Sequence, residues 1–140
     1  MTSDQANILL HEIKAYYDSI PSSKYRHADL DTLKEKFEHL RGKVDAVNVT
    51  DNQTAVVRMS SAAASAIMVA SGVEPNFQMV CRDRNRLAMM ADVLGVYSLG
   101  VRNMLCLSGD HMQFGDHPQA KPVFDRILTE VIRIVNGQSQ

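Results

Sequence analysis

Four short apolar runs alternate with helix-like segments along this chain, and no hairpin signal lies between them. The runs cover residues 7–13, 43–50, 76–81 and 101–110, and the last one ends abruptly in Ser-Gly-Asp. Strands that are joined through helices form parallel sheets with right-handed crossovers. The alternation therefore predicts an α/β fold in which four strand–helix units, (βα)4, build a parallel sheet.

The predicted helices are marked by apolar spacing and by glycine stops. Leu30, Leu33, Phe37 and Leu40 form one apolar face, which ends at Gly42. An Ala-rich helix over 60–71 stops at Gly72, and a third helix over 87–94 is closed by residues 95–100. A last helix is predicted over 125–135, with an apolar face made of Ile127, Leu128, Val131, Ile132 and Val135. Residues 14–27 are interpreted as a long loop insert.

Length and charge narrow the class of protein. The 140 residues suggest a single domain over 1–140, which is short for an eight-unit barrel of about 250 residues. A net charge of -1 gives no indication of a nucleic-acid or anionic-membrane partner. Neither an apolar run of about 20 residues nor a signal peptide is found, so we expect a cytoplasmic protein. Cys81 and Cys106 fall in predicted strands and are expected to be buried, reduced thiols.

Polar residues gather where the predicted strands end. Parallel strands present their carboxyl ends at one edge of the sheet, where α/β folds place their sites. That edge would collect Glu12, Thr50, Asp51, Asn52, Gln78, Arg82, Asp83, Ser108, Gly109, Asp110 and His111. The set holds no metal signature, no phosphate-binding glycine loop and no Ser-His-Asp arrangement. Glu12 and Asp110 could divide labour as a general acid and an electrostatic partner, although Asp110 could equally cap a loop. The residues alone predict the binding of a polar small molecule.

Several motifs resemble the methylenetetrahydrofolate reductase family, and most closely its bacterial branch that also occurs fused to methyltransferase domains. They are Val-Asp-Ala-Val-Asn-Val-Thr-Asp-Asn at 44–52, Cys-Arg-Asp-Arg-Asn at 81–85, and the segments 94–103 and 105–111. The similarity runs from about residue 8 to residue 125. It implies a βα barrel that binds FAD and reduces methylenetetrahydrofolate to methyltetrahydrofolate. The chain would then be a half-barrel, a truncated TIM-barrel-like arrangement.

The resemblance also implies roles for individual residues. Glu12 matches the family's general acid, which is thought to protonate N10 as the imidazolidine ring opens. Asp110 matches the aspartate that lies by the flavin and the pterin. Thr50, Ser108 and Gly109 match positions that contact or approach the flavin. Gln78 stands at a further flavin-binding position, where many relatives have His. Burial beside the flavin would raise the pKa of an acid such as Glu12 and keep it neutral before transfer.

The chain departs from the family pattern in two ways. After Glu12, relatives usually continue with a Pro-Pro pair, which is replaced here by the insert. The chain also stops where relatives have about half a barrel still to come. Because a half-barrel leaves two edge strands uncovered, we expect a second copy or another chain to complete it. The expected partners are a folate substrate and an electron donor, either a nicotinamide nucleotide or a protein. The alternatives are a non-catalytic partner, a folate- or flavin-binding subunit, or a fragment without independent activity.

Overall fold

The computed structural model describes residues 30–125, which alternate helices and strands as the sequence predicts. Three α-helices, α2 (Leu30–Leu40), α3 (Ser61–Ala70) and α4 (Arg86–Ser98), alternate with β1 (Val47–Val49), β2 (Pro75–Val80) and β3 (Asn103–Leu107). Two short 3-10 turns, η2 (Gln53–Ala55) and η3 (Met112–Phe114), follow β1 and β3. The predicted strand over 7–13, the insert 14–27 and most of the last predicted helix lie outside the described residues.

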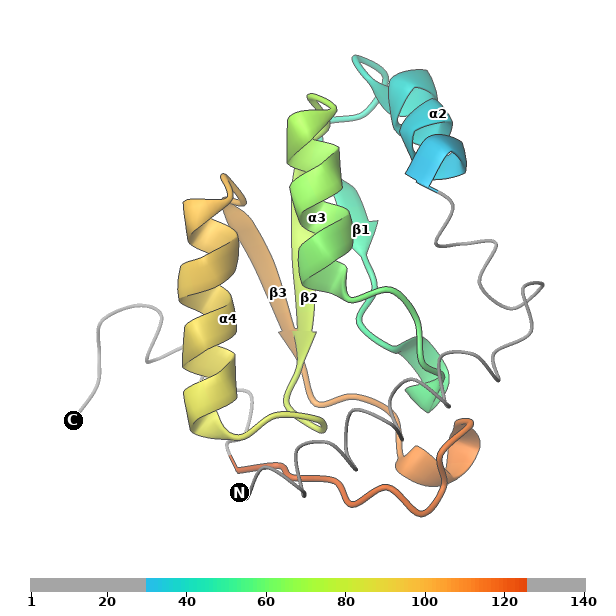
Figure 1. Ribbon diagram of the computed structural model, residues 1–140, viewed down its shortest axis with the longest axis vertical. Coiled ribbons are helices and arrows are strands. Elements are labelled where there is room, and N and C mark those ends of the chain that lie inside the picture. Colours follow the sequence, from blue (N-terminus) through green and yellow to red (C-terminus); the bar gives the residue numbers. More distant parts are fainter. Residues whose placement is uncertain (1–29, 126–140) are drawn as a thin grey trace, which may run out of the picture.

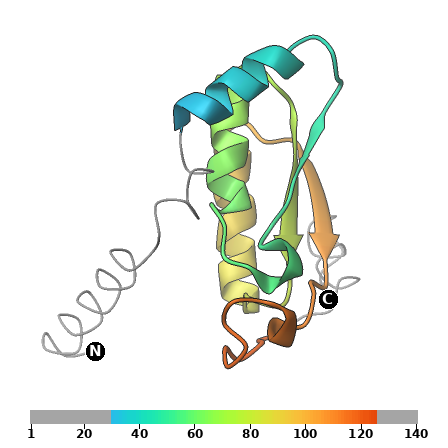
Figure 2. The same cartoon turned by 90° about the vertical axis from the view of Figure 1, so that its right-hand side faces the viewer.

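The strands form a parallel sheet in the order β1-β2-β3 (Figure 1). Val49 is in register with Phe77 of β2, and Phe77 is in register with Met104 of β3. In the described part of the chain, all the helices lie on one face of this sheet, as the turned view in Figure 2 shows. The α/β class and the parallel sheet are therefore confirmed, and the arrangement is consistent with part of a barrel.

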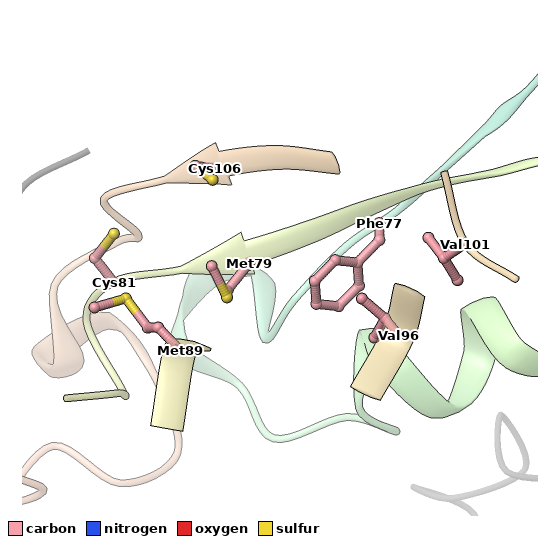
Figure 3. Close-up of a cluster of buried hydrophobic side chains, with 7 residues drawn as sticks. All are labelled: Phe77, Met79, Cys81, Met89, Val96, Val101 and Cys106. Atoms are coloured by element: carbon pink, nitrogen blue, oxygen red, sulfur yellow. The ribbon is translucent and has the colours of Figure 1, made fainter. Parts of the chain in front are cut away.

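The core fills the space between the sheet and the helices (Figure 3). Its larger cluster joins alternate residues of β2 to α4 and β3, and consists of Phe77, Met79, Cys81, Met89, Val96, Val101 and Cys106. A second cluster joins α2, β1 and α3, and consists of Phe37, Val49, Met68 and Val73. Alternation along each strand sends every second side chain into these clusters and the others to the opposite, open face.

Several predicted elements have different limits in the structure, and the run predicted over 101–110 is a strand only over Asn103–Leu107. The strand predicted over 43–50 is shorter, because pairing with β2 begins only at Val47, opposite Pro75. The third helix is longer than predicted and contains Gly95, because Val96 packs into the core one residue further on. It ends before Gly100, which has a φ of 96° and accepts the left-handed conformation without a Cβ clash.

Both cysteines are buried and free, as expected from the sequence. Burial raises the pKa of the Cys106 thiol to about 11, and the neighbouring Cys81 adds to the rise. The thiols therefore behave as small apolar side chains in the core. None of the helices within residues 30–125 is long and apolar enough to cross a membrane.

Candidate functional site

The open face of the sheet carries polar side chains from all three strands. Asn48, Asn76 and Asn103 lie in one row of the register, near the amino ends of the strands. The Asn76 amide donates a 2.7 Å hydrogen bond to the Asn48 side chain, and Asn103 donates one of 2.8 Å to Glu74. One layer further along, Gln78 lies opposite Leu105. The open face is therefore a polar surface that leads toward the carboxyl ends of the strands.

A cavity of about 260 Å³ lies at those carboxyl ends. It is lined by Asp51, Asn52, Gln53, Gln78, Val80, Arg82, Leu107, Ser108, Gly109 and Asp110. Of the residues with predicted site roles, the structure thus brings together Gln78, Ser108, Gly109 and Asp110. Thr50 is exposed, directly before the first lining residue, and Glu12 lies outside the described residues.

Gln78 is one of three buried polar side chains that line this cavity, together with Asp51 and Arg82. Its residue is only 9% exposed, and it forms no side-chain hydrogen bond with any residue of the described range. Unlike the side chains of Asp51 and Arg82, its amide is not held by hydrogen bonds to the described part of the protein. Gln78 therefore offers both a donor and an acceptor to a molecule that enters the cavity.

Gly109 allows the end of β3 to approach the end of β2. Its φ is 90°, a conformation that side-chain-bearing residues rarely adopt. A Cβ at this position would lie 3.2 Å from the Cβ atoms of both Val80 and Arg82. The glycine is thus required by the packing of the protein's own backbone at the floor of the cavity.

Asp110 both lines the cavity and caps a loop. Its carboxylate oxygen Oδ2 accepts a 2.8 Å hydrogen bond from the backbone amide of Thr54, beyond the end of β1. The backbone carbonyl of Asp110 accepts a second hydrogen bond, 2.9 Å long, from Arg82. The loop-capping alternative from the sequence is therefore seen in the structure, and it positions the carboxylate at the cavity wall.

Arg82 holds this edge of the sheet together from inside. It is 1% exposed, forms a bidentate pair with Asp83 at 2.6 and 2.7 Å, and also donates to the carbonyls of Asn52 and Asp110. The Asp83 hydrogen bond raises the pKa of Arg82 despite burial. Burial by itself would raise the pKa of Asp83, but the hydrogen bond and charge of Arg82 outweigh it and lower that pKa. Arg82 therefore stays charged and ties the loops after β1 and β3 to the end of β2.

A second ion pair, between Arg84 and Asp51, stabilises the wall of the cavity. Asp51 accepts a 2.9 Å hydrogen bond from the Val80 amide and a 2.6 Å hydrogen bond from Arg84, which also binds Asp92 at 2.7 Å. Burial works against the charge of Arg84, yet the two aspartates raise its pKa overall. The Arg-Asp-Arg sequence thus supplies one buried and one partly buried guanidinium group, which fix backbone positions around the cavity.

The loops after β1 and β3 also contact each other directly, beyond the carboxyl ends of the strands. Asn52, Thr54 and Ala55 all have positive φ, between 44° and 58°. A Cβ on Gly115 would overlap the backbone carbonyl of Ala55, so the two loops touch there. The Val57 amide donates to the Asp116 carboxylate at 3.2 Å.

Sequence reasoning missed this closure of the two loops. The Asp-Asn pair after β1 is the one available signal, because Asn tolerates left-handed backbone. Within residues 30–125, no group of three or more His, Cys, Asp or Glu side chains could hold a metal ion. The arrangement therefore suits an organic ligand that is recognised by an amide, backbone groups and a carboxylate.

The comparisons with known proteins bear on the identity of this site. The family model for methylenetetrahydrofolate reductase matches residues 27–140 of the chain. No curated protein and no solved structure matches significantly.

Proposed function

The chain belongs to the methylenetetrahydrofolate reductase family, and on this premise we propose that it acts in the flavin-dependent reduction of 5,10-methylenetetrahydrofolate to 5-methyltetrahydrofolate. The observation that carries the proposal is the cavity that gathers Gln78, Ser108, Gly109 and Asp110 at the carboxyl end of the parallel sheet. This edge is where parallel α/β folds bind ligands. The family match itself supports a folate-related oxidoreductase.

The cavity residues fit the polar edge of a flavin. The unpartnered Gln78 amide can donate and accept, and the exposed Thr50 hydroxyl stands beside the cavity. At about 260 Å³ the cavity falls below the roughly 300–1,000 Å³ of most ligand pockets. We therefore propose that the residues of this cavity would hold only part of FAD.

The protein's own groups would bind and orient in this reaction. When FAD is bound, it supplies the hydride that reduces the folate. Gln78 and Thr50 would fix the cofactor by hydrogen bonds, and the Asp110 carboxylate would place negative charge at the cavity wall. Glu12, which lies outside the described residues, remains our proposed acid for N10 of the folate.

We further propose that the chain works within an assembly. In the described sheet, β1 and β3 are the two outer strands, and exposed strand edges invite pairing. A second copy or another chain would complete the barrel, and a nicotinamide nucleotide or a protein would reduce the flavin.

A flavin titration of the full chain, combined with a mass measurement by light scattering, tests this proposal. We expect the purified protein to bind FAD, with a shifted flavin absorbance, and to be larger than a monomer. A colourless monomer that stays colourless in excess FAD would contradict both proposals and favour a non-catalytic role.

The two carboxylates can be tested separately once FAD binding is seen. Glu12→Gln is expected to abolish folate reduction while FAD still binds. Asp110→Asn keeps an oxygen that accepts from the Thr54 amide, so it should preserve the fold and change the rate at which the flavin is reduced or reoxidised. Full turnover in Glu12→Gln, or unaltered flavin kinetics in Asp110→Asn, would remove the corresponding role.

A further inference from the structure

The backbone that follows β1 is strained at residues 52–55. Asn52, Thr54 and Ala55 have φ values of 44°, 58° and 57°, in the left-handed region that favours glycine. Asn tolerates this region, whereas Thr, which branches at Cβ, is an outlier there. Strained backbone persists only where surrounding contacts hold it, and it occurs often in segments that move during function. The 52–55 segment is therefore a candidate for a part of the structure that moves.

Contacts from the loop after β3 hold the 52–55 segment in place. Figures 1 and 2 show the two loops next to each other beyond the ends of the strands. The Thr54 amide donates its 2.8 Å hydrogen bond to Oδ2 of Asp110, and Gly115 packs against Ala55. The backbone of the outlier, Thr54, thus depends on a carboxylate that belongs to another loop.

The 52–55 segment is also part of the cavity wall. Asn52 and Gln53 line the cavity of about 260 Å³, as does Asp110. In this closed form the cavity is smaller than the roughly 300–1,000 Å³ of most ligand pockets. A molecule that draws the Asp110 carboxylate toward its own N–H or O–H donor would take Oδ2 away from the Thr54 amide. The same side chain can therefore hold the wall or bind a ligand.

We propose that the 52–55 segment is a strained, movable wall of the cavity, which the Asp110 carboxylate keeps closed. When a ligand draws Asp110 away from Thr54, the backbone relaxes and the wall opens, while the sheet stays folded. Opening widens the cavity for molecules that the closed form excludes. This movement is a property of the ligand-free chain and goes beyond the proposed reductase function, so it does not require that FAD binds.

Hydrogen exchange of the ligand-free full chain tests the strain. Thr54→Gly keeps the amide donor and removes the Cβ from left-handed backbone, so the amides of residues 54–58 should exchange about threefold more slowly. Gln53→Gly is the matched control, because Gln53 has no positive φ and a glycine there relieves no strain. Its exchange should stay the same or rise. Equal effects of the two glycine substitutions would overturn the proposal.

The same measurement tests the role of Asp110. Asp110→Ala removes the acceptor of the Thr54 amide, so exchange over residues 54–58 should rise by about tenfold. Asp110→Asn keeps an oxygen that accepts, and exchange should rise much less. Peptides that cover β2 and β3 should not change in either variant. If exchange in β2 rises equally, or if Asp110→Ala has no effect, a locally opening wall held by Asp110 is excluded.

Thiol labelling tests whether the wall controls access to the cavity. Gln78→Cys places a thiol at a lining position that is 9% exposed, and the unmodified chain gives the background from the buried Cys81 and Cys106. The probes are methyl methanethiosulfonate, which is small, and dithiobis-nitrobenzoate, which is bulky. Adding Thr54→Gly, at a residue that does not line the cavity, should slow the bulky reagent about threefold and leave the small one nearly unchanged. An unaltered rate of the bulky reagent would show that the 52–55 segment does not control entry.

Discussion

The two faces of the sheet divide the tasks of this molecule. On the helix-covered face, Phe77 and Met79 are fully buried among apolar neighbours. On the open face, their neighbours Asn76 and Gln78 carry amides, although each lies one residue away along the same strand. Because side chains alternate along a strand, a shift of one residue separates a packing role from the binding role proposed for Gln78. For each position in β2, the first question is therefore which face of the sheet its side chain points to.

The largest effect is expected on the helix-covered face. Phe77→Ala should lower the free energy of unfolding by about 3–5 kcal/mol, because the fully buried ring leaves a cavity. Urea denaturation measures this change. Leu105→Ala, on the open face and 39% exposed, is the matched control and should cost about 1 kcal/mol. Equal losses of unfolding free energy in the two variants would show that the two faces of the sheet do not differ in their packing role.

The second largest loss of stability is expected from Arg82, at the carboxyl edge of the sheet. Arg82→Met should destabilise the protein by about 3 kcal/mol, because Asp83 loses its partner and two loop carbonyls lose their donor. The double variant Arg82→Met with Asp83→Leu should regain part of that loss, since no unpaired carboxylate remains. Urea denaturation again gives the numbers. An unaltered stability in the single variant would show that the ion pair is dispensable.

A smaller effect is expected from alkaline pH on the helix-covered face. Burial raises the pKa of Cys106 to about 11, whereas an unfolded thiol titrates near 8.5. The unfolded state therefore loses its proton first, and stability should fall as pH rises between these two values. Urea midpoints at pH 8 and pH 10.5 measure the slope. Cys106→Ala should reduce the slope, and an identical slope would assign it to other groups.

The smallest change in stability is expected at Gln78 on the open face. Gln78→Leu should alter the free energy of unfolding by no more than about 1 kcal/mol, because the amide has no partner among the described residues. The same variant should weaken FAD binding roughly threefold to tenfold, the equivalent of one hydrogen bond. Fluorescence titration of the flavin measures the affinity. An unchanged affinity for FAD would show that the Gln78 amide on the open face does not bind the cofactor.

Much of the fold was predictable because its signals are local. Gly42 and Gly72 mark the ends of α2 and α3, and both have positive φ. Gly95 was misleading, since the packing of Val96 outweighs the helix propensity of one glycine. The start of β1 depends on where β2 begins, which is a non-local fact that no pattern within 43–50 contains.

The lining of the cavity was predictable in part, whereas the contacts that hold it together were not. Parallel strand ends place Gln78, Gly109 and Asp110 at one edge, and the structure brings them together. The Asp110–Thr54 contact joins residues that are 56 positions apart, and no sequence pattern in either loop predicts it. The same holds for Arg82, whose charge in the sequence suggests a solvated run, whereas the structure buries it among carbonyls and Asp83.

The tight contact between Gly115 and Ala55 affects how substitutions at Gly115 should be interpreted. Gly115 does not line the cavity, yet any side chain there would collide with the Ala55 carbonyl and push the two strand-end loops apart. Asp110 would then lose its anchor at Thr54 without being altered itself. A harmful allele at this glycine would imitate a defect in the chemistry, although no residue that lines the cavity would itself be substituted.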